Sequence, residues 1–170
     1  GLTPDARSLL ASLRIHSALP STNAFLLNRI PQYPSGTACL AELQTAGRGR
    51  LGRSWQSPLA GNLYLSLLWH FSNAAMLGGL SLAVGVVLVR ALRTLGVPDI
   101  ALKWPNDILW RERKLGGVLL ELSGEVHGRC AVVIGIGINF RMPTNHAAAI
   151  DQAFTELRQI SGLRLPSRNA

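Results

Sequence analysis

Short apolar runs alternate along this chain with stretches rich in glycine, proline and small polar residues. An apolar run bounded by turn-forming residues is typical of a strand in a folded sheet. On this pattern we predict strands at residues 37–43, 62–71, 99–102, 113–121 and 130–139. The last two of these runs predict a β-hairpin that is joined through residues 123–128.

Helical signals lie between and around these runs. Thr3 and the proline after it match an N-cap followed by proline at the first helical position, which predicts a short helix through Leu13. A second helix is predicted to follow Ser21, because short polar residues there precede an apolar run. A third is predicted over residues 146–160, with Asn145 as its cap.

The longest helix candidate spans residues 74–95 and is apolar on every side over much of its length. A membrane span is the alternative interpretation. The apolar stretch is shorter than the roughly 20 residues that a bilayer requires, and it ends on Arg90 and Arg93. Small or polar residues also interrupt it, namely Gly78, Gly79, Ser81 and Gly85. We therefore predict a core helix packed against the sheet, and no interaction with a membrane.

Residues 47–55, which we call the arginine loop, lack apolar periodicity and hold three glycines, three arginines and Trp55. Glycine lets the backbone approach a ligand closely, and arginine offers a planar fork of donors that matches phosphate or carboxylate oxygens. A tryptophan face can stack on a base. Such a tract can also be a disordered nucleic-acid-binding segment or a solvated basic loop. Its place between two predicted strands favours an ordered loop that binds an anion.

The formal net charge of +8 admits a polyanionic partner. The 17 cationic residues include only two lysines, Lys103 and Lys114, which suggests positions where a compact ammonium group is required. A bias in base composition explains the arginine excess equally well. Because the arginines are dispersed, a pocket for a small anion explains them at least as well as a DNA-binding face.

At 170 residues the chain fits one domain, and its 48% hydrophobic content is that of a globular protein. Cys39 and Cys130 lie in apolar runs, where cysteine usually acts as a small hydrophobic residue. Two cysteines make neither a disulfide framework nor a metal site. Without a signal peptide, the expected compartment is the cytoplasm. The chain begins at Gly1, which suggests a fragment or a processed protein.

Polar residues gather at the ends of the predicted elements. Residues 21–23 favour a helix cap, although three short polar side chains at a helix start can also bind a urea or amide group. Gln44 follows a strand, and residues 103–107 form a turn that brings a lysine near an asparagine and an aspartate. Gly135 and Gly137 leave one face of their strand bare, so that a ligand or another segment can come close.

Four motifs in order resemble the catalytic domain of biotin protein ligases over residues 21–139. They are Gly-Arg-Gly-Arg-Leu-Gly-Arg at 47–53, Lys-Trp-Pro-Asn-Asp at 103–107, Lys-Leu-Gly-Gly-Val-Leu-Leu-Glu at 114–121 and Gly-Ile-Gly-Ile-Asn at 135–139. The resemblance implies an α+β fold, with a mixed, largely antiparallel sheet flanked by helices and a core like that of class II aminoacyl-tRNA synthetases. It also implies that ATP activates biotin to biotinyl-5′-adenylate, which then modifies a lysine of a biotin carboxyl carrier protein.

The resemblance also assigns site residues position by position. The biotin-binding residues would be Ser21, Thr22, Asn23, Gln44, Arg48, Gly49, Arg50 and Lys114. The residues that bind ATP and the adenylate would be Arg50, Arg53, Trp55, Lys103, Asn106, Asp107 and Asn139. As catalytic residues, Arg50 and Lys114 would offset charge at the carboxylate and α-phosphate, and Asp107 would help to deprotonate the acceptor lysine. Magnesium would arrive with ATP, without a metal site of its own.

The chain departs from the family pattern at both ends. It has neither a repressor-type helix-turn-helix before the catalytic domain nor the small β domain that commonly follows it, so residues 1–170 are expected to form a single catalytic domain without DNA binding. The alternatives are a lipoate ligase, a non-catalytic biotin-binding fragment and a basic nucleic-acid binder. A homodimer is also predicted, paired through the strand at 130–139 and residues 141–143, if that strand lies at a sheet edge.

Overall fold

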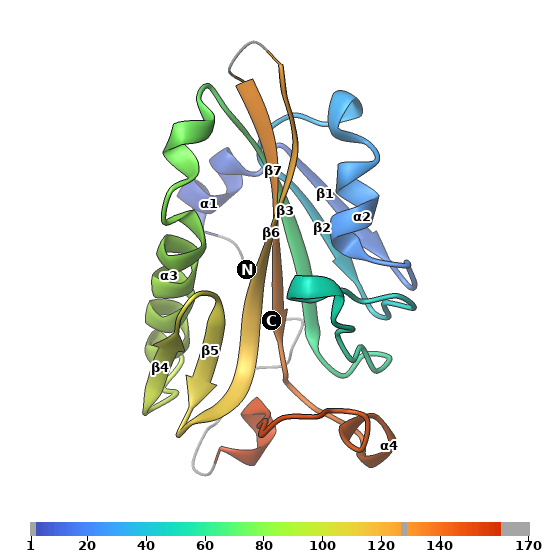
Figure 1. Cartoon of the computed structure of the whole chain (residues 1–170), viewed down its shortest axis with the longest axis vertical. Coiled ribbons are helices and arrows are strands. Elements are labelled where there is room, and N and C mark those ends of the chain that lie inside the picture. The colour runs from blue at the N-terminus through green and yellow to red at the C-terminus, as the bar shows by residue number, and fades with distance from the viewer. Residues whose placement is uncertain (1–2, 127–128, 161–170) are drawn as a thin grey trace.

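The computed structural model describes residues 3–126 and 129–160, and a seven-stranded sheet forms its centre (Figure 1). The strands lie in the order β1-β2-β3-β7-β6-β5-β4. All neighbours in the sheet are antiparallel except β1 and β2, which are parallel. The strands are β1 Ser12–His16, β2 Thr37–Ala41, β3 Leu63–Phe71, β4 Ile100–Lys103, β5 Asp107–Trp110, β6 Arg113–Val126 and β7 Arg129–Ile138.

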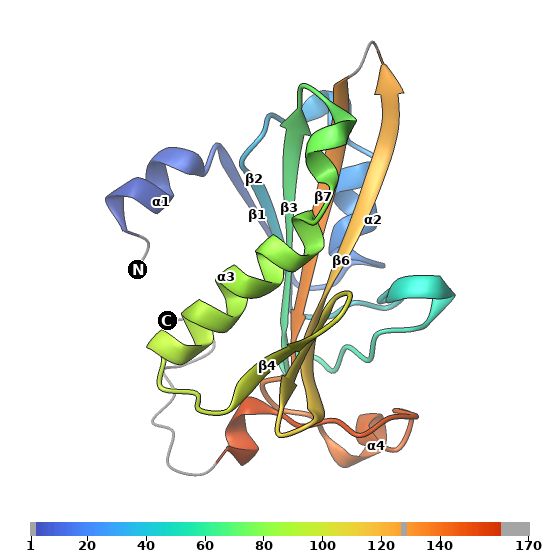
Figure 2. The same cartoon turned by 60° about the vertical axis from the view of Figure 1, so that its left-hand side comes forward.

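Four α-helices and four short 3-10 helices accompany these strands in the described part of the chain. The α-helices are α1 Pro4–Leu9, α2 Thr22–Leu27, α3 Leu80–Thr94 and α4 Thr144–Ala147. The 3-10 helices are η1 Ile30–Gln32, η2 Arg50–Gly52, η3 Ala74–Leu77 and η4 Leu157–Gln159. Helices α2 and α3 cover opposite faces of the sheet, and Figure 2 shows α3 in front of it and α2 behind. The expected α+β class with a mixed, largely antiparallel sheet is confirmed.

Alternation along β7 divides the core into two clusters. Val132, Ile134, Ile136 and Ile138 belong to the cluster under α3. The intervening positions face α2, where Ala131 and Val133 pack with Leu26 of that helix. Gly135 and Gly137 continue this second face without side chains. Because successive side chains of a strand point to opposite faces, one strand supplies both the α3 core and the open surface described below.

Two helix predictions at the ends of the chain are wrong in extent. The N-terminal helix is capped by Thr3 as predicted, but it ends at Leu9 instead of Leu13. Residues 12–16 form β1, which pairs with a strand 25 residues further along the chain. In place of the helix predicted at 146–160, the structure has the end of the short α4 and, near its far end, the 3-10 helix η4. Between them, the segment near Phe154 runs beside Lys114 as an isolated parallel bridge. Pairing with distant segments outweighed local helical preference in both places.

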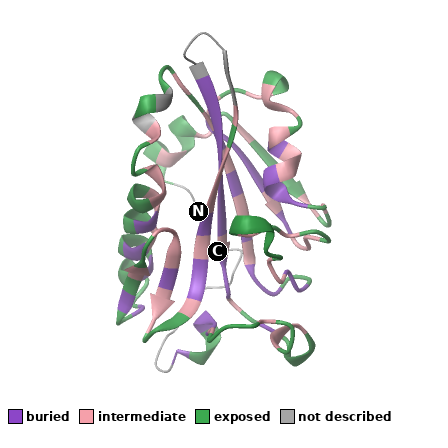
Figure 3. Cartoon of the chain, viewed as in Figure 1, coloured by how far each residue is buried: buried purple, intermediate pink, exposed green. Residues whose placement is uncertain are grey.

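The long helix and the turn before it also differ from expectation. Gly79 has a left-handed backbone (φ 77°), which separates η3 from α3. Helix α3 buries one face on the sheet, while Leu82, Val86 and Val87 remain exposed, and Figure 3 shows this exposed outer side in green. The outer side of the helix therefore faces solvent. The predicted packing of this helix against the sheet is correct for its inner side only. In the part of the chain that the structure describes, no helix is long and apolar enough to cross a membrane.

The position of β7 contradicts the predicted dimer interface through the strand at 130–139. Strand β7 pairs with β3 on one side and β6 on the other, so its backbone groups are already used within the sheet. The edge strands are β1 and β4. A prediction that relied on an exposed β7 edge is therefore wrong, because strand order depends on topology and not on the composition of the strand.

Candidate active site

A cavity of about 330 Å³ lies over the glycine-marked face of β7. Its wall is formed by the start of α2, the exit of β2, the arginine loop, the turn between β4 and β5, and the middle of β6 and β7. Every site residue predicted from the sequence lines this cavity except Asn139. The structure thus brings together residues that are spread over more than ninety positions of the chain.

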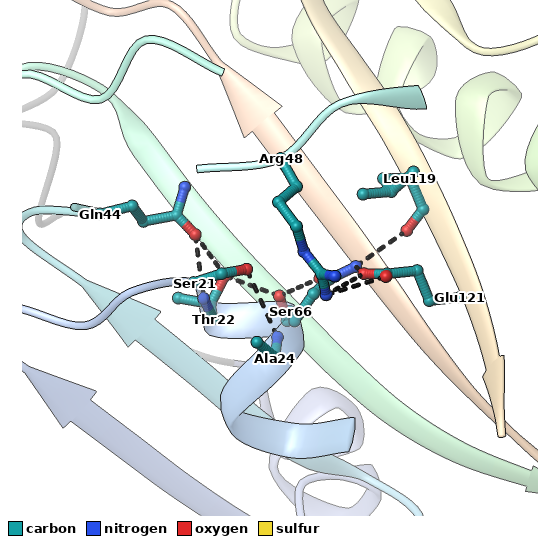
Figure 4. A network of polar contacts seen from close by, with 9 residues as sticks. Ser21, Thr22, Ala24, Gln44, Arg48, Ser66, Leu119 and Glu121 are labelled. Atoms are coloured by element: carbon teal, nitrogen blue, oxygen red, sulfur yellow. Dashed lines mark hydrogen bonds and ion pairs between the residues drawn. The ribbon is translucent and has the colours of Figure 1, made fainter. Parts of the chain in front are cut away.

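A polar network closes one end of the cavity (Figure 4). Ser21 caps α2 by accepting a hydrogen bond from Ala24 N, so its predicted role as a cap is confirmed. The Gln44 side-chain oxygen accepts hydrogen bonds from Thr22 N at 2.9 Å and from Thr22 Oγ1 at 3.1 Å. The Gln44 amide nitrogen donates to Ser57 Oγ at 3.2 Å. Cap and pocket wall are therefore the same residues, and binding of a urea or amide group by residues 21–23 stays a prediction.

Asn23 occupies the space that Gly135 leaves open. A Cβ atom at Gly135 would lie 2.3 Å from Asn23 Oδ1, so the glycine is required for the asparagine to pack there. Ser66, directly opposite Gly135 on β3, donates from its buried hydroxyl to Asn23 Oδ1 and lies 2.7 Å from Thr22 Oγ1. The Asn23 Nδ2 donates to Leu119 O and to the Glu121 carboxylate. The bare strand face therefore receives a side chain of the protein itself.

The arginine loop is an ordered turn over the cavity. Arg48 and Ser54 form an isolated antiparallel bridge, and Gly49 N donates to Arg53 O at 2.7 Å. Leu51 at the tip has a left-handed backbone (φ 56°), which is uncommon for a residue with a side chain. Arg50 Nη1 donates to Asn106 Oδ1 at 3.3 Å, so the loop is linked to the turn between β4 and β5.

A lysine–aspartate pair stands between the loop and the sheet. Lys114 Nζ lies 2.8 Å from Asp107 Oδ1, and their side chains are only 15% and 22% exposed. The partner of Asp107 is thus Lys114, whereas Lys103, its neighbour in the motif, is exposed. Lys114 Nζ also lies 5.7 Å from the centre of the Trp55 ring. The site therefore holds a cationic group with reduced access to water beside an aromatic face.

A second cavity of about 550 Å³ adjoins the first. Arg53, Trp55 and Lys114 line both. The Trp55 ring packs on the bare Cα of Gly137, where a Cβ atom would lie 2.7 Å from the ring. The indole Nε1 of Trp55 is buried and has no hydrogen-bond partner among the described residues. Trp55 thus forms the partition between the two cavities and leaves one buried donor for a ligand.

Asn139 lines the second cavity but not the first. It is 4% exposed, and its Nδ2 donates to Lys114 O at 3.4 Å and Thr155 O at 3.1 Å. Its amide therefore joins the end of β7 to the segment that follows α4. Binding of adenine by Asn139 remains a prediction, and the Nδ2 atom already has two partners within the protein.

Two residues of this network were not singled out from the sequence. Ser66 lies within an apolar strand, and its only signal was a hydroxyl at a position that alternates with leucines. Glu121 was quoted within a motif without a role, although a carboxylate in the run Leu119-Leu120-Glu121-Leu122 is itself a signal. No group of three or more His, Cys, Asp or Glu residues that could hold a metal ion occurs in the described ranges.

The fold and the two cavities define an α+β protein that can hold a small polar organic molecule next to an anionic ligand. The cationic groups Arg48, Arg50, Arg53, Lys103 and Lys114 lie around the first cavity. The sequence model of the Biotin/lipoate A/B protein ligase family matches residues 16–139. The chain belongs to this family.

Curated relatives agree with this assignment. The chain is 43% identical over 155 residues to the bifunctional ligase/repressor BirA of Escherichia coli (strain K12), which covers 91% of this chain and 48% of that protein. It is 41% identical over 122 residues to the biotin–acetyl-CoA-carboxylase ligase of Paracoccus denitrificans, with 70% of this chain and 50% of that protein covered. The chain thus spans about half the length of these relatives.

Solved structures share the fold. The biotin protein ligase of Leishmania major in complex with biotinyl-5-AMP superimposes with a TM-score of 0.77 at 26% identity, covering 94% of this chain and 69% of that one. The biotin protein ligase of Aquifex aeolicus in complex with biotin and ATP gives a TM-score of 0.70 at 35% identity, with 94% and 64% covered. The expected resemblance to biotin protein ligases is confirmed.

Proposed function

We propose that residues 1–170 are the catalytic domain of a biotin protein ligase, which activates biotin with ATP and transfers it to a lysine of a carrier protein. The observation that carries the proposal is the polar end of the first cavity, where Thr22, Asn23 and Gln44 meet next to the arginine loop. A ureido ring presents two N–H donors and one carbonyl acceptor, so it requires several paired polar groups. The names and bound ligands of the relatives support the same choice.

In the first step, a carboxylate oxygen of biotin attacks the α-phosphorus of ATP. A new P–O bond forms, the bond to the bridging oxygen of the β-phosphate breaks, and pyrophosphate leaves with biotinyl-5′-adenylate as the product. Arg50 and Lys114 are the proposed groups that offset the negative charge around the reacting atoms, because both line the cavity beside Trp55. Trp55, Arg53, Lys103, Asn106 and Asn139 are the proposed nucleotide contacts.

In the second step, the acceptor lysine loses a proton and its amine attacks the acyl carbon of the adenylate. The C–N bond forms, the bond from the acyl carbon to the phosphate oxygen breaks, and AMP leaves. Asp107 is the proposed proton acceptor, and its ion pair with Lys114 holds it at the junction of the two cavities. Magnesium bound to the phosphates of ATP would supply further charge neutralisation.

The proposed partner is a biotin carboxyl carrier protein, in line with the relatives named for acetyl-CoA carboxylase. We also propose a cytoplasmic location, because Cys39 and Cys130 are free and buried, as is usual in a reducing compartment. A homodimer stays a prediction, and the edge strands on which it could be built are β1 and β4. We expect no DNA binding by this chain.

Calorimetry with biotin and with lipoate separates the proposal from a lipoate ligase. We expect biotin to bind and lipoate to bind weakly, because a dithiolane ring leaves the polar end of the cavity without partners. Thr22→Val should weaken biotin binding about tenfold, since it removes a hydrogen bond in a desolvated network. Thr94→Val is the matched control, because that hydroxyl bonds within the exposed end of α3. Tight binding of lipoate without biotin would overturn the proposal.

Release of pyrophosphate separates an enzyme from a biotin sensor. With biotin, ATP and magnesium, we expect pyrophosphate release that depends on biotin. Binding of biotin without pyrophosphate release would identify a non-catalytic biotin-binding fragment. A nucleic-acid binder would instead show DNA affinity that falls steeply with salt.

A further inference from the structure

Glu121 is an acidic side chain beside the arginine loop, and it lines a recess under that loop next to the first cavity. It projects from β6 on the face that carries Val133 and Gly135 of β7, and it is 22% exposed. Its Oε1 lies 2.8 Å from Arg48 Nη2. Its Oε2 accepts hydrogen bonds from Arg48 Nη2 at 3.1 Å (Figure 4) and from Asn23 Nδ2 at 2.7 Å. One carboxylate therefore joins the arginine loop to the polar end of the cavity.

A carboxylate is not suited to bind a carboxylic acid or a phosphate directly. Glu121 would repel such a ligand if its charge were free. Both of its oxygens are instead occupied by groups of the protein, and Arg48 carries the opposite charge. The geometry therefore favours a role in holding other residues in place, with the charge neutralised inside the protein.

The carboxylate also decides which way the Asn23 amide faces. An ionised carboxylate only accepts hydrogen bonds, so the donor end of the amide must face Glu121. The Oδ1 end then faces Ser66, which donates to it. An amide oxygen has two lone pairs, and Ser66 uses one of them. The second lone pair is left for a donor such as a urea N–H in the cavity that Asn23 lines.

We infer that Glu121 is a positioning residue that couples the Asn23 amide to the arginine loop through Arg48. It fixes the amide orientation at the floor of the cavity, and it holds the base of the loop above. The inference deepens the proposed function, because the loop and the amide would enclose the same ligand. The contact between Arg48 and Glu121 itself is a property of the protein without ligand, so it can be tested separately.

The first test uses limited trypsin digestion without any ligand. Glu121→Gln keeps the shape and an acceptor for Asn23 but removes the charge that attracts Arg48. We expect cleavage after Arg50 and Arg53 to become about two- to fivefold faster, because the variant loses a partly exposed ion pair that holds the loop. Glu112→Gln is the matched control, because it removes the same charge from an exposed turn between β5 and β6. Thermal unfolding of each variant verifies that the fold is retained.

A double-mutant cycle then asks whether Glu121 acts through Arg48. Arg48→Met should accelerate cleavage after Arg50 and Arg53, and adding Glu121→Gln should change it little further. Equal cleavage of the unsubstituted chain and Glu121→Gln would overturn the inference. Additive effects of the two substitutions would overturn it as well, because Glu121 would then act independently of Arg48.

The second test uses biotin, and it separates the two contacts of Glu121. Glu121→Ala removes the acceptor for Asn23 as well as the charge, so it should weaken biotin binding about tenfold. Glu121→Gln should weaken biotin binding less and should release biotinyl-adenylate about threefold faster. Equal biotin affinities of the two variants would contradict the role in orienting Asn23. If the unsubstituted chain neither binds biotin nor releases pyrophosphate, the proposed function fails, and the trypsin results still decide whether Glu121 anchors the loop.

Discussion

At the scale of single residues, the site depends on two glycines as much as on its polar groups. Gly135 and Gly137 lie on the same face of β7, one beneath Asn23 and the other beneath Trp55. Both would-be Cβ atoms fall closer than 3.0 Å to the side chain above. Each glycine therefore sets the height of one side chain above it, Asn23 or Trp55, and both glycines line the first cavity.

Gly135→Ala should reduce biotin affinity about tenfold or more, because a methyl group 2.3 Å from Asn23 Oδ1 must displace the amide from Ser66 and Glu121. Calorimetry with biotin measures this effect. Gly78→Ala is the control, since its Cβ would meet nothing closer than 3.8 Å. Unchanged biotin affinity of Gly135→Ala would show that Asn23 can move without cost to the ligand.

Gly137→Ala should instead weaken ATP binding, by about tenfold, because a methyl group 2.7 Å from the Trp55 ring must shift the partition between the two cavities. Biotin affinity should fall less in this variant than in Gly135→Ala. Titration of both variants with both ligands tests the separation. Equal loss of ATP and biotin affinity in each variant would contradict it.

Much of this residue-level picture was predictable because the motifs are short and lie at strand ends and in one loop. Residues 21–23, Gln44 and the arginine loop are recognisable by polar or glycine-rich composition next to apolar runs. Ser66 was not, since its inward direction depends on the register that places it opposite Gly135. The link from Glu121 to Arg48 was equally hidden, because it joins positions 73 residues apart.

At the scale of elements, the central strands were predicted well and the peripheral elements poorly. Strands β2, β3, β6 and β7 have long apolar runs, so their pattern identifies them before any tertiary contact is known. Strand β5 has only four residues and follows a proline turn, and it was missed. The start of strand β1 was assigned to a predicted helix, because its partner β2 is remote in the chain. The apolar residues all round α3 likewise concealed which side faces water.

The two sides of α3 provide a prediction for this element. Val87 is 64% exposed, whereas Val89, two residues away, is 8% exposed and packs in the main core. Val89→Ser should lower the free energy of unfolding by about 2–3 kcal/mol, through lost burial and a buried hydroxyl. Val87→Ser should change it by less than about 0.5 kcal/mol. Urea unfolding of this chain measures both, and equal losses would mean that the outer side of α3 is also packed.

At the scale of the whole molecule, β7 lies in the middle of the sheet and separates two core clusters. The larger cluster lies under α3, and the smaller one lies under α2 around Leu26, Cys39 and Leu68. Composition could indicate that β7 is buried but not where it falls in the sheet, since strand order follows from pairings between remote segments. The predicted dimer interface through β7 was wrong for this reason. The smaller cluster matters for function because the same helix, α2, starts at the polar end of the cavity.

Cys39 links this smaller cluster to the pH dependence of global stability. Burial raises the pKa of the Cys39 thiol from 9.0 to about 11, and the charge of Arg29 offsets part of the rise. Below pH 9 the thiol is protonated in both the folded and the unfolded chain. Above pH 9 the unfolded chain loses the proton while the folded chain keeps it, so stability falls as the pH rises toward 11.

We therefore expect the free energy of unfolding to fall by about 1 kcal/mol between pH 8.5 and pH 10 because of this one thiol. Other groups also titrate in this range, so the quantity to compare is the difference between the unsubstituted chain and Cys39→Ala. Urea unfolding at several pH values measures it for both. The difference should shrink as the pH rises, since the variant has no thiol to keep protonated. A difference that does not change with pH would show that Cys39 ionises as easily in the folded protein as in the unfolded chain, and hence that the cluster under α2 admits water.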